Sequence, residues 1–292
     1  MRLRDRKYSS FADKSNIFDN TYDTAYPQTV VAGIVRKHLY DNPTEKKKRV
    51  LIYGFDGARA DSIAFLLPEK QDFYKNGYSA VAYLKSCGGL YLSYAGGNKN
   101  DPSTLQETST AQGWCSVLTG VWGIENGVVK HTTKKDSVPT ILTEGAEKGL
   151  SAVFSSVWAD HFTITYKNEI EAAKQKGLPL AFLQVRDENE LQAEMLSAID
   201  NGTDIIFGIN EFPDANGHES GFSNRNHKYI SGIINADRYA AELLSHIQKR
   251  SEYENEDWLI LITSDHGGHQ RRHGTQKAED RMTFLAVNKK IR

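Results

Sequence analysis

Short, largely apolar runs recur along the chain and predict buried strands. Four of them span residues 50–55, 152–157, 204–209 and 258–263. Runs with little polar alternation are typical of strands covered on both faces, as in a parallel sheet. Three of the four lead within a few residues to aspartate and histidine side chains. The pattern therefore places polar groups where apolar strands end.

Between these runs the apolar residues adopt helical spacing. Helices are predicted over residues 28–40, 59–67, 139–148 and 230–247, and another directly after Thr110. The glycine-rich stretch 87–98 predicts turns. Alternating strands and helices are typical of βαβ units. The chain is therefore predicted to have an α/β fold, with a large, mostly parallel central sheet and helices on both faces.

The segment before the first strong strand has a different composition from the rest. Asp, Asn, Ser and Tyr dominate residues 1–45, apart from the helix predicted there. We expect residues 1–45 to be a peripheral N-terminal extension and residues 46–292 to form one domain, because no internal repeat or low-complexity segment divides them. A single domain of this size buries about three quarters of its unfolded surface.

Composition excludes some partners. The chain has 36 Lys and Arg against 37 Asp and Glu, so no bulk charge favours a nucleic acid polymer or an anionic membrane. No apolar run approaches the roughly 20 residues of a membrane span, and the basic N-terminus lacks the apolar core of a secretory signal. We expect a cytoplasmic protein. Cys87 and Cys115 are predicted to be buried thiols without a disulfide.

The acidic and histidine residues after the strands are candidate metal ligands. Asp56 follows the first strand, and Asp265 and His266 follow the last, with His273 shortly beyond. Taken alone, Asp56 is better explained as a helix cap. Parallel strands, however, end at one edge of a sheet, where several carboxylates repel one another unless cations neutralise them.

A second pair supports the same interpretation. Asp214 and His218 are four positions apart, which places both on one helix face or lets a loop wrap them around one ion. An isolated pair of this kind is more often a turn or a cap. His269 lies near these motifs, but a surface histidine needs no role, and it is left out of the predicted ligand set.

Thr110 is a candidate nucleophile at the start of a predicted helix. Taken alone, Ser109 and Thr110 are better explained as a simple N-cap. A hydroxyl is a weak nucleophile at its ordinary pKa, and coordination to a divalent cation activates it. A helix that begins here would also direct free N–H groups at a bound anion.

Together the motifs resemble the alkaline phosphatase superfamily, most closely its nucleotide pyrophosphatase/phosphodiesterase and sulfatase-like members. The order carries the resemblance: Phe55-Asp56-Gly57, Thr110 with Thr119-Gly120 and Asn126-Gly127, Pro213-Asp214 with Gly217-His218, Ser264-Asp265-His266-Gly267, and His273-Gly274. The similarity extends from about residue 50 onward. It implies an alkaline-phosphatase-like fold.

The resemblance also implies two divalent metal ions and their ligands. Asp214, His218 and His273 would bind one ion. Asp56, Asp265 and His266 would bind the other, together with the hydroxyl of Thr110. A mixed Asp and His set suits Zn²⁺, with Mn²⁺ as the alternative. The implied reaction is hydrolysis of a small-molecule phosphate ester through a phosphothreonine intermediate.

The chain departs from the family pattern beside the nucleophile. The phosphodiesterases commonly have Pro-Asn shortly after it, whereas this chain has Ala111-Gln112-Gly113. Gln112 or a backbone N–H would have to replace that Asn. Thr110 cannot become formylglycine, which disfavours a sulfatase. Phosphodiesterase activity is favoured over a phosphomonoesterase, a phosphomutase and a catalytically silent metal-binding protein.

Overall fold

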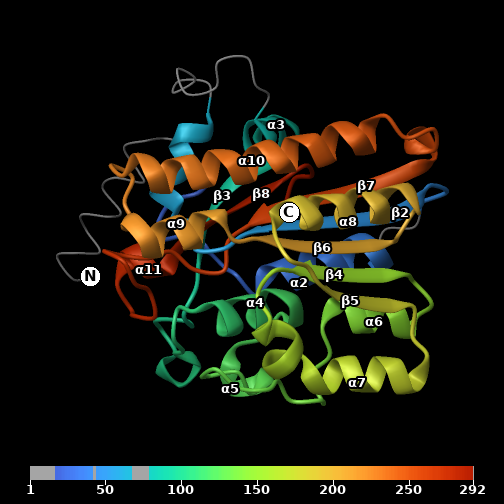
Figure 1. Ribbon diagram of the computed structural model, residues 1–292, viewed down its shortest axis with the longest axis horizontal. Helices are drawn as coiled ribbons and strands as arrows, with labels where there is room; N and C mark the ends of the chain where they lie inside the picture. Colours follow the sequence, from blue (N-terminus) through green and yellow to red (C-terminus); the bar gives the residue numbers. More distant parts are fainter. Residues whose placement is uncertain (1–16, 42–43, 68–78, 292) are drawn as a thin grey trace.

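The fold is described by a computed structural model that covers residues 17–41, 44–67 and 79–291 of the 292-residue chain. These residues form an eight-stranded sheet with the order β1-β3-β8-β7-β2-β6-β4-β5 (Figure 1). The strands are β1 Tyr26–Pro27, β2 Lys47–Phe55, β3 Gly89–Tyr94, β4 Ala152–Ser156, β5 Leu180–Gln184, β6 Ile205–Asn210, β7 Glu256–Thr263 and β8 Met282–Val287. β8 runs antiparallel to β3 and β7, and the other neighbouring pairs are parallel. The predicted α/β class and mostly parallel sheet are confirmed.

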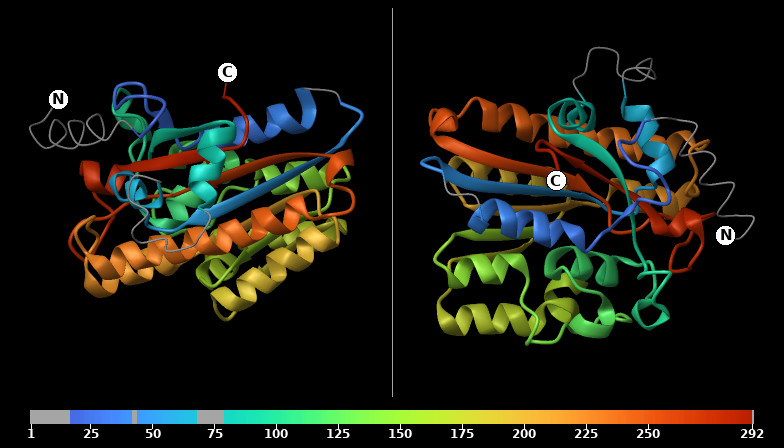
Figure 2. Two further views of the ribbon diagram at one scale, coloured as in Figure 1. Left: turned by 90° about the horizontal axis from the view of Figure 1, so that it is seen from above. Right: turned by 180° about the vertical axis from the view of Figure 1, so that it is seen from behind.

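Helices cover both faces of this sheet (Figure 2). The α-helices are α2 Val30–Arg36, α3 Ala80–Cys87, α4 Thr110–Thr119, α5 Gly123–Asn126, α6 Ile141–Glu147, α7 Lys167–Lys176, α8 Glu188–Asp200, α9 Phe212–Ser220, α10 His227–Gln248 and α11 Ala278–Arg281. Two π-helices, η1 Lys37–Asp41 and η5 His161–Thr165, and three 3₁₀-helices, η2 Ala60–Leu66, η4 Pro102–Thr104 and η6 Tyr253–Asn255, complete the described elements.

Two hydrophobic cores lie on opposite faces of β2. Leu51 and Tyr53 pack into the core formed with α3, α8 and α10, whereas Val50 and Ile52 pack into the core formed with α2, α4 and α6. Successive side chains of a strand point to opposite faces, so both registers of β2 must be apolar. This explains the continuous apolar runs. Within the described residues, no helix has the length and hydropathy of a membrane span.

Several local predictions differ from the structure. The glycine-rich stretch 87–98 contains β3, because this segment pairs with β8 from a remote part of the sequence. Cys87 is exposed at the end of α3, although it was predicted to be buried, whereas Cys115 is buried as predicted. The helix expected over residues 59–67 is the 3₁₀-helix η2.

Part of the N-terminal segment belongs to the core. Helix α2 buries Val31, Ala32 and Val35 beside α4 and α6. The strand β1 extends the sheet beyond β3. This part of residues 1–45 therefore contributes core side chains instead of lying outside the core.

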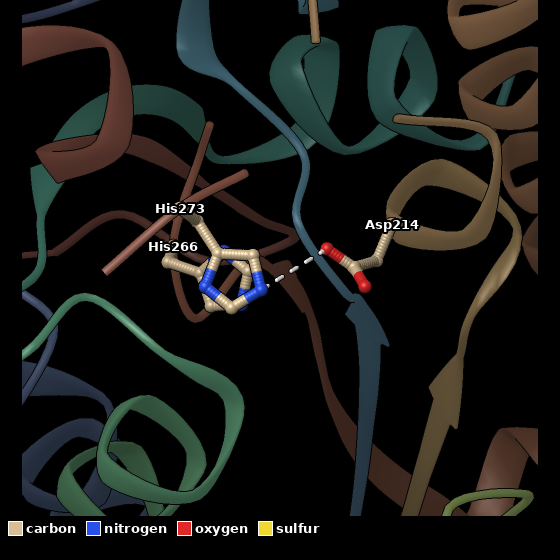
Figure 3. Close-up of side chains that lie close together, drawn as sticks. All are labelled: Asp214, His266 and His273. Atoms are coloured by element: carbon tan, nitrogen blue, oxygen red, sulfur yellow. Dashed lines mark ion pairs between the residues drawn. The ribbon is translucent and has the colours of Figure 1, made fainter. Parts of the chain in front are cut away.

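The strand ends position polar groups at both edges of the sheet. β2 pairs with β6 from Val50 to Phe55 and with β7 from Lys47 to Gly54, so these strands finish almost level. The segments that follow them bring Asp214, His266 and His273 side by side (Figure 3).

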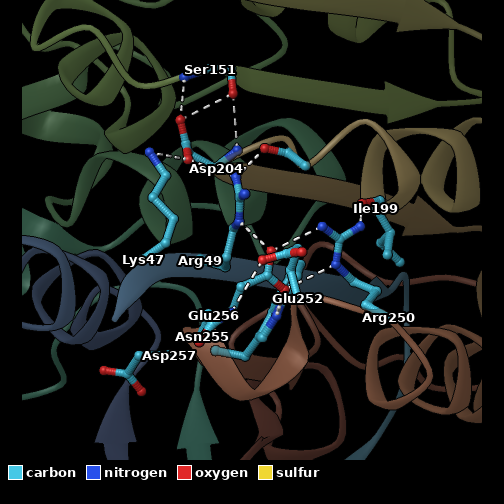
Figure 4. Close-up of polar contacts among 12 residues, drawn as sticks. Lys47, Arg49, Ser151, Ile199, Asp204, Arg250, Glu252, Asn255, Glu256 and Asp257 are labelled. Carbon is cyan, nitrogen blue, oxygen red and sulfur yellow. Dashed lines mark hydrogen bonds and ion pairs between the residues drawn. The ribbon is translucent and has the colours of Figure 1, made fainter. Parts of the chain in front are cut away.

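The opposite edge, where β2, β6 and β7 begin, holds a charge network (Figure 4). Arg49 contacts Asp204 at 2.8 Å and Glu256 at 3.1 Å. Both oxygens of Glu256 accept from Arg250 at 2.9 Å. Its side chain is 2% exposed. Burial raises the pKa of Glu256, but hydrogen bonds from Arg250 and Trp258 outweigh burial, and the pKa is lowered overall. The network joins three strands through paired charges.

We expect Glu256→Gln to lower the free energy of unfolding by about 3 kcal/mol, because it leaves two arginines that are only 12% and 11% exposed without their shared carboxylate. Urea unfolding at neutral pH measures the difference. The exposed neighbour Glu254 provides the control, since Glu254→Gln should change stability by less than about 0.5 kcal/mol.

Comparing the wild type with Glu256→Gln at different pH values tests the protonation of Glu256. A carboxylate whose pKa is lowered by folding stabilises the protein above its ordinary pKa of 4.5, and that contribution is lost as the pH falls through the lowered value. The advantage of the wild type over Glu256→Gln should therefore shrink on acidification. An advantage that stays constant down to acid unfolding contradicts this assignment.

Candidate metal centre

Asp56 and Gly57 form the turn that ends β2. The N–H of Asp56 donates to the carbonyl of Asn210 at 3.0 Å, which extends the pairing with β6 by one residue. Gly57 has φ 67°, and a Cβ at this position would lie 2.6 Å from Oδ1 of Asp214. Glycine is therefore required here for its left-handed backbone and for the close approach of α9.

The end of β7 places Asp265 and His266 against this turn. The N–H of Gly57 donates to Oδ1 of Asp265 at 3.2 Å. Nε2 of His266 lies 3.5 Å from Oδ1 of Asp56 and 3.3 Å from Oδ2 of Asp265. All three side chains are fully buried. Their ligand atoms lie within 4.8 Å of one another, a spacing that one metal ion can bridge.

Helix α9 supplies a second group of ligand atoms. Asp214 and His218 lie one turn apart, and Nε2 of His218 is 3.2 Å from Oδ2 of Asp214. Nε2 of His273 lies 3.2 Å from Nε2 of His218 and 3.8 Å from Oδ1 of Asp214. The rings of His273 and His266 stack with centroids 4.0 Å apart. The two groups therefore meet at one continuous site.

The three imidazoles are oriented in the same way. Nδ1 of His266 bonds to the carbonyl of Gly267 at 2.8 Å, and Nδ1 of His273 bonds to the carbonyl of Thr108 at 3.1 Å. Nδ1 of His218 bonds to the carbonyl of Arg271 at 2.9 Å. Because a carbonyl only accepts, each Nδ1 must carry a proton. Burial lowers the pKa values of His266 and His273, so these two rings are neutral and turn an unprotonated Nε2 towards the site, as metal-binding histidines do.

Electrostatics make this site unfavourable without cations. Burial and then the charge of Asp214 raise the pKa of Asp56 well above its ordinary value, and burial and then Asp56 do the same to Asp265. Burial, followed by repulsion from His273, lowers the pKa of His266 to about 3. The hydrogen bond with Asp214 raises the pKa of His218 to about 9. The described residues of the site therefore supply too little positive charge to keep these carboxylates ionised.

Open ligand atoms provide a direct test of fit to a metal. Oδ1 of Asp56, Oδ1 of Asp214 and Oδ2 of Asp265 are buried, and none has a hydrogen-bond partner among the described residues. Buried polar atoms without a partner are costly. Divalent cations would satisfy these oxygens and allow the carboxylates to ionise. The oxygen and nitrogen donors present therefore fit such ions.

Thr110 is the first residue of α4 and faces this site. Its Oγ1 lies 3.3 Å from Nε2 of His266. Gly113 lets α4 approach the end of β7, since a Cβ there would lie 2.7 Å from the backbone oxygen of Asp265. Ser109 makes no side-chain capping bond, so the alternative N-cap interpretation gains no support from its hydroxyl.

Some residues of the site were not identified from the sequence. Nε1 of Trp114 donates to Oδ2 of Asp56 at 2.8 Å, and the indole is fully buried. Its position four residues after Thr110, on the same helix face, was an available signal. The hydroxyl of Tyr229 donates to the carbonyl of Gly57 at 2.7 Å. No local pattern marks that residue, because the contact depends on the packing of α10.

The remaining candidates occupy supporting positions. Gln112 is buried, and its amide is 3.4 Å from both Glu107 and the carbonyl of Val129. It is therefore engaged in contacts with other residues. His269 bonds to Asp280 at 2.6 Å through Nδ1. Glu211, which the sequence did not single out, is held beside Ser156, and burial followed by the charge of Asp56 raises its pKa well above its usual range.

Comparison with solved structures finds the same fold at low sequence identity. The alkaline phosphatase from the Antarctic bacterium TAB5 is similar with a TM-score of 0.51 and 14% identity, over 83% of this chain and 91% of that chain. Murine ectonucleotide pyrophosphatase/phosphodiesterase 5 is similar with a TM-score of 0.50 and 17% identity, over 76% of this chain and 58% of that chain. BT1596, a 2-O GAG sulfatase, is similar with a TM-score of 0.53 and 12% identity, over 83% of this chain and 64% of that chain.

No protein-family model and no curated protein sequence matches the chain. The structural similarity nevertheless confirms the predicted alkaline-phosphatase-like fold. At these identities it establishes the fold alone.

The close contact at Gly57 generates a matched test of the metal centre. Gly57→Ala should abolish uptake of the ion beside Asp214, because the new methyl group displaces that carboxylate. Gly177 has a similar φ of 63° but nothing within 4 Å of its Cβ position, so Gly177→Ala introduces the same backbone strain without the contact. Both variants should lose about 1 kcal/mol of stability from that strain.

Metal analysis after equilibration with zinc and gel filtration measures the difference. We expect two ions in the wild type and in Gly177→Ala, and fewer in Gly57→Ala. Equal metal content in the two variants contradicts the assignment of Asp214 as a ligand.

Proposed function

We propose that this chain, which has the fold of the alkaline phosphatase superfamily, hydrolyses phosphate esters with two divalent cations and with Thr110 as nucleophile. One observation carries the proposal. The hydroxyl of Thr110 lies 3.3 Å from the unprotonated nitrogen of His266, within the cluster that Asp56 and Asp265 complete. A hydroxyl beside open ligand atoms is the arrangement that metal activation of a nucleophile requires.

The two ligand groups would each hold one ion. Asp214, His218 and His273 would hold the first, with Nε2 of His218 3.2 Å from both Asp214 and His273. Asp56, Asp265 and His266 would hold the second beside Thr110. Mixed nitrogen and oxygen donors suit Zn²⁺, with Mn²⁺ as the alternative. When bound, such ions lower the proton affinity of a hydroxyl oxygen and offset negative charge on the phosphoryl group.

The start of α4 provides the other requirements of phosphoryl transfer. Its first turn leaves the N–H groups of Thr110, Ala111 and Gln112 without an acceptor in the helix, and these can bind a phosphoryl oxygen. Because the Gln112 side chain is engaged elsewhere, the backbone is the better replacement for the missing Asn. Attack by Thr110 forms a phosphothreonine, which water then hydrolyses to restore the hydroxyl.

The charges favour a phosphodiester slightly. Two divalent cations against Asp56, Asp214 and Asp265 leave about one positive charge, which an ionised Thr110 cancels. A diester carries one negative charge and a monoester two, so the diester fits the neutral centre more easily. Phosphomonoesterase or phosphomutase activity is the second candidate.

Two other rivals make distinct predictions. A catalytically silent metal-binding protein would take up both ions without turnover of any ester. A sulfatase would cleave p-nitrophenyl sulfate, but Thr110 stands at the nucleophile position and cannot be converted to formylglycine.

We expect Thr110→Ala to lower kcat for bis(p-nitrophenyl) phosphate at least 1,000-fold, of the order seen when an essential nucleophile is removed. Both ions should remain bound, because Thr110 is the least essential of the proposed ligands. Release of p-nitrophenolate and metal analysis measure the two effects.

Two control substitutions isolate the hydroxyl. Thr110→Ser should keep measurable activity, and Ser109→Ala should change kcat less than about twofold, because the neighbouring hydroxyl makes no capping bond. Full activity in Thr110→Ala refutes the nucleophile assignment. No turnover of the diester or of p-nitrophenyl phosphate by the metal-loaded wild type favours the silent rival.

A further inference from the structure

We infer that Asp280 is a positioning residue for His273 and thereby sets the affinity of the ion that His273 would bind. The inference rests on the proposed function, because it assigns a role in the metal centre to a carboxylate that belongs to neither ligand group. Asp280 lies in α11 and is fully buried. It holds the chain on both sides of His273.

Both carboxylate oxygens of Asp280 accept hydrogen bonds from residues that flank His273. Oδ1 accepts from Nδ1 of His269 at 2.6 Å. Oδ2 accepts from the N–H of Thr275 at 2.9 Å and from the hydroxyl of the same residue at 2.6 Å. His269 lies four positions before His273, and Thr275 lies two positions after it. One carboxylate therefore closes the loop that carries this histidine.

The turn before His273 connects its backbone to the anchored His269. The N–H of His269 donates to the carbonyl of Arg272 at 2.8 Å, and the reverse bond measures 3.1 Å. Gln270 within this turn has φ 52°, a left-handed conformation uncommon for residues other than glycine. Arg272 directly precedes His273. A shift of His269 away from Asp280 would therefore displace the backbone of His273.

The backbone after His273 is held from the other side by Thr108. The N–H of Gly274 donates to the carbonyl of Thr108 at 2.9 Å, and the hydroxyl of Thr108 donates to the carbonyl of Thr275 at 2.8 Å. The same carbonyl of Thr108 bonds to Nδ1 of His273. Because Asp280 holds Thr275 against this segment, it also helps to fix the direction of the imidazole.

The second ligand group depends on Asp280 only through the backbone. The carbonyl of Asp280 accepts from the N–H of Gly267 at 2.8 Å, and Gly267 directly follows His266. A substitution of the side chain keeps this carbonyl, so the bond behind His266 remains. Removal of the carboxylate should therefore weaken the ion beside His273 and spare the ion beside His266.

The other ring nitrogen of His269 raises the alternative of direct metal coordination. Nε2 is buried and has no hydrogen-bond partner among the described residues. A ring bonded to a carboxylate through Nδ1 is also typical of a metal ligand. His269 nevertheless belongs to neither group of ligand atoms that lie within 4.8 Å of one another. The described contacts therefore assign this ring to Asp280.

A two-site zinc titration against a chelator tests the inference. In Asp280→Asn the side-chain amide turns its NH2 group towards either His269 or Thr275, which both donate, so one set of bonds is lost. We expect the ion beside His273 to bind about tenfold more weakly, as for the loss of outer-shell partners. The other ion should change by less than about twofold. His273→Ala identifies which binding step belongs to which ion.

Asp204 provides a matched control at the opposite edge of the sheet. Its Oδ2 accepts from the N–H of Ser151 at 2.9 Å and from the hydroxyl of that serine at 3.1 Å, as Asp280 does from Thr275. Asp204→Asn therefore removes a carboxylate with similar partners, and it should leave both zinc affinities unchanged. Equal weakening in Asp204→Asn and Asp280→Asn would mean that both residues act only through overall stability, which overturns the inference.

Two substitutions of His269 test the same contact, and they serve also if Asp280→Asn does not fold. An asparagine amide can donate to Asp280 in place of Nδ1 but has no counterpart of Nε2. His269→Ala should weaken the ion beside His273 about tenfold, and His269→Asn should restore most of that affinity. Equal losses in the two variants would mean that Nε2 binds the ion directly, which overturns the positioning role.

Hydrolysis of bis(p-nitrophenyl) phosphate separates this inference from the proposed function. Excess zinc should restore kcat of Asp280→Asn to within about twofold of the wild type, because Asp280 acts through ion affinity. A kcat that stays low at saturating zinc overturns the inference. Unchanged zinc affinity in both Asp280→Asn and His269→Ala also overturns it, and leaves the proposed function intact if the wild type hydrolyses the ester.

The wild type alone tests the proposed function. A wild type that binds two zinc ions but hydrolyses no ester refutes that function, and the affinities of the variants then decide the role of Asp280. A wild type that binds no zinc contradicts both.

Discussion

Two buried carboxylates and a third that is 14% exposed dominate the energetics of the site. Asp56, Asp214 and Asp265 each hold an oxygen that no donor in the described residues satisfies. Such a cluster destabilises a folded chain unless positive charge enters it. Three features hold these oxygens at the spacing that cations need. They are the left-handed turn at Gly57, the shared orientation of three imidazoles, and the close packing of α4 against the end of β7.

Strands β2, β6 and β7 have acidic groups near both ends, but these groups are neutralised by arginines at only one end. Where β2, β6 and β7 begin, Arg49 and Arg250 neutralise Asp204 and Glu256 within the protein itself. Where these strands finish, the acidic groups are left open. Paired charges and two apolar faces thus hold the sheet together independently of the site. Unsatisfied groups can persist at one edge because the surrounding structure fixes them there.

The sequence predicted the class of fold and the residues that converge, because both depend on local patterns. Apolar runs mark strands buried on two faces, and the acidic residues directly after β2 and β7 must lie at one edge once the strands are parallel. The antiparallel pairing of β3 with β8 was missed, since no local signal specifies a partner so distant in sequence. Tyr229 was missed for the same reason, because its role arises from packing between elements. Trp114 was also missed, although its position one helical turn after Thr110 was a local signal. The exposure of Cys87 depends on where α3 ends against the sheet.

The position of β8 has a consequence for biosynthesis. It follows all the other strands in chain order, yet it lies between β7 and β3. Strands β1 and β3 emerge early from the ribosome, but the rest of the sheet offers them no pairing edge until β8 has been translated. β3 can pair with β1, but its other edge must wait through most of synthesis without a partner, a state in which exposed strand edges invite aggregation and chaperone binding.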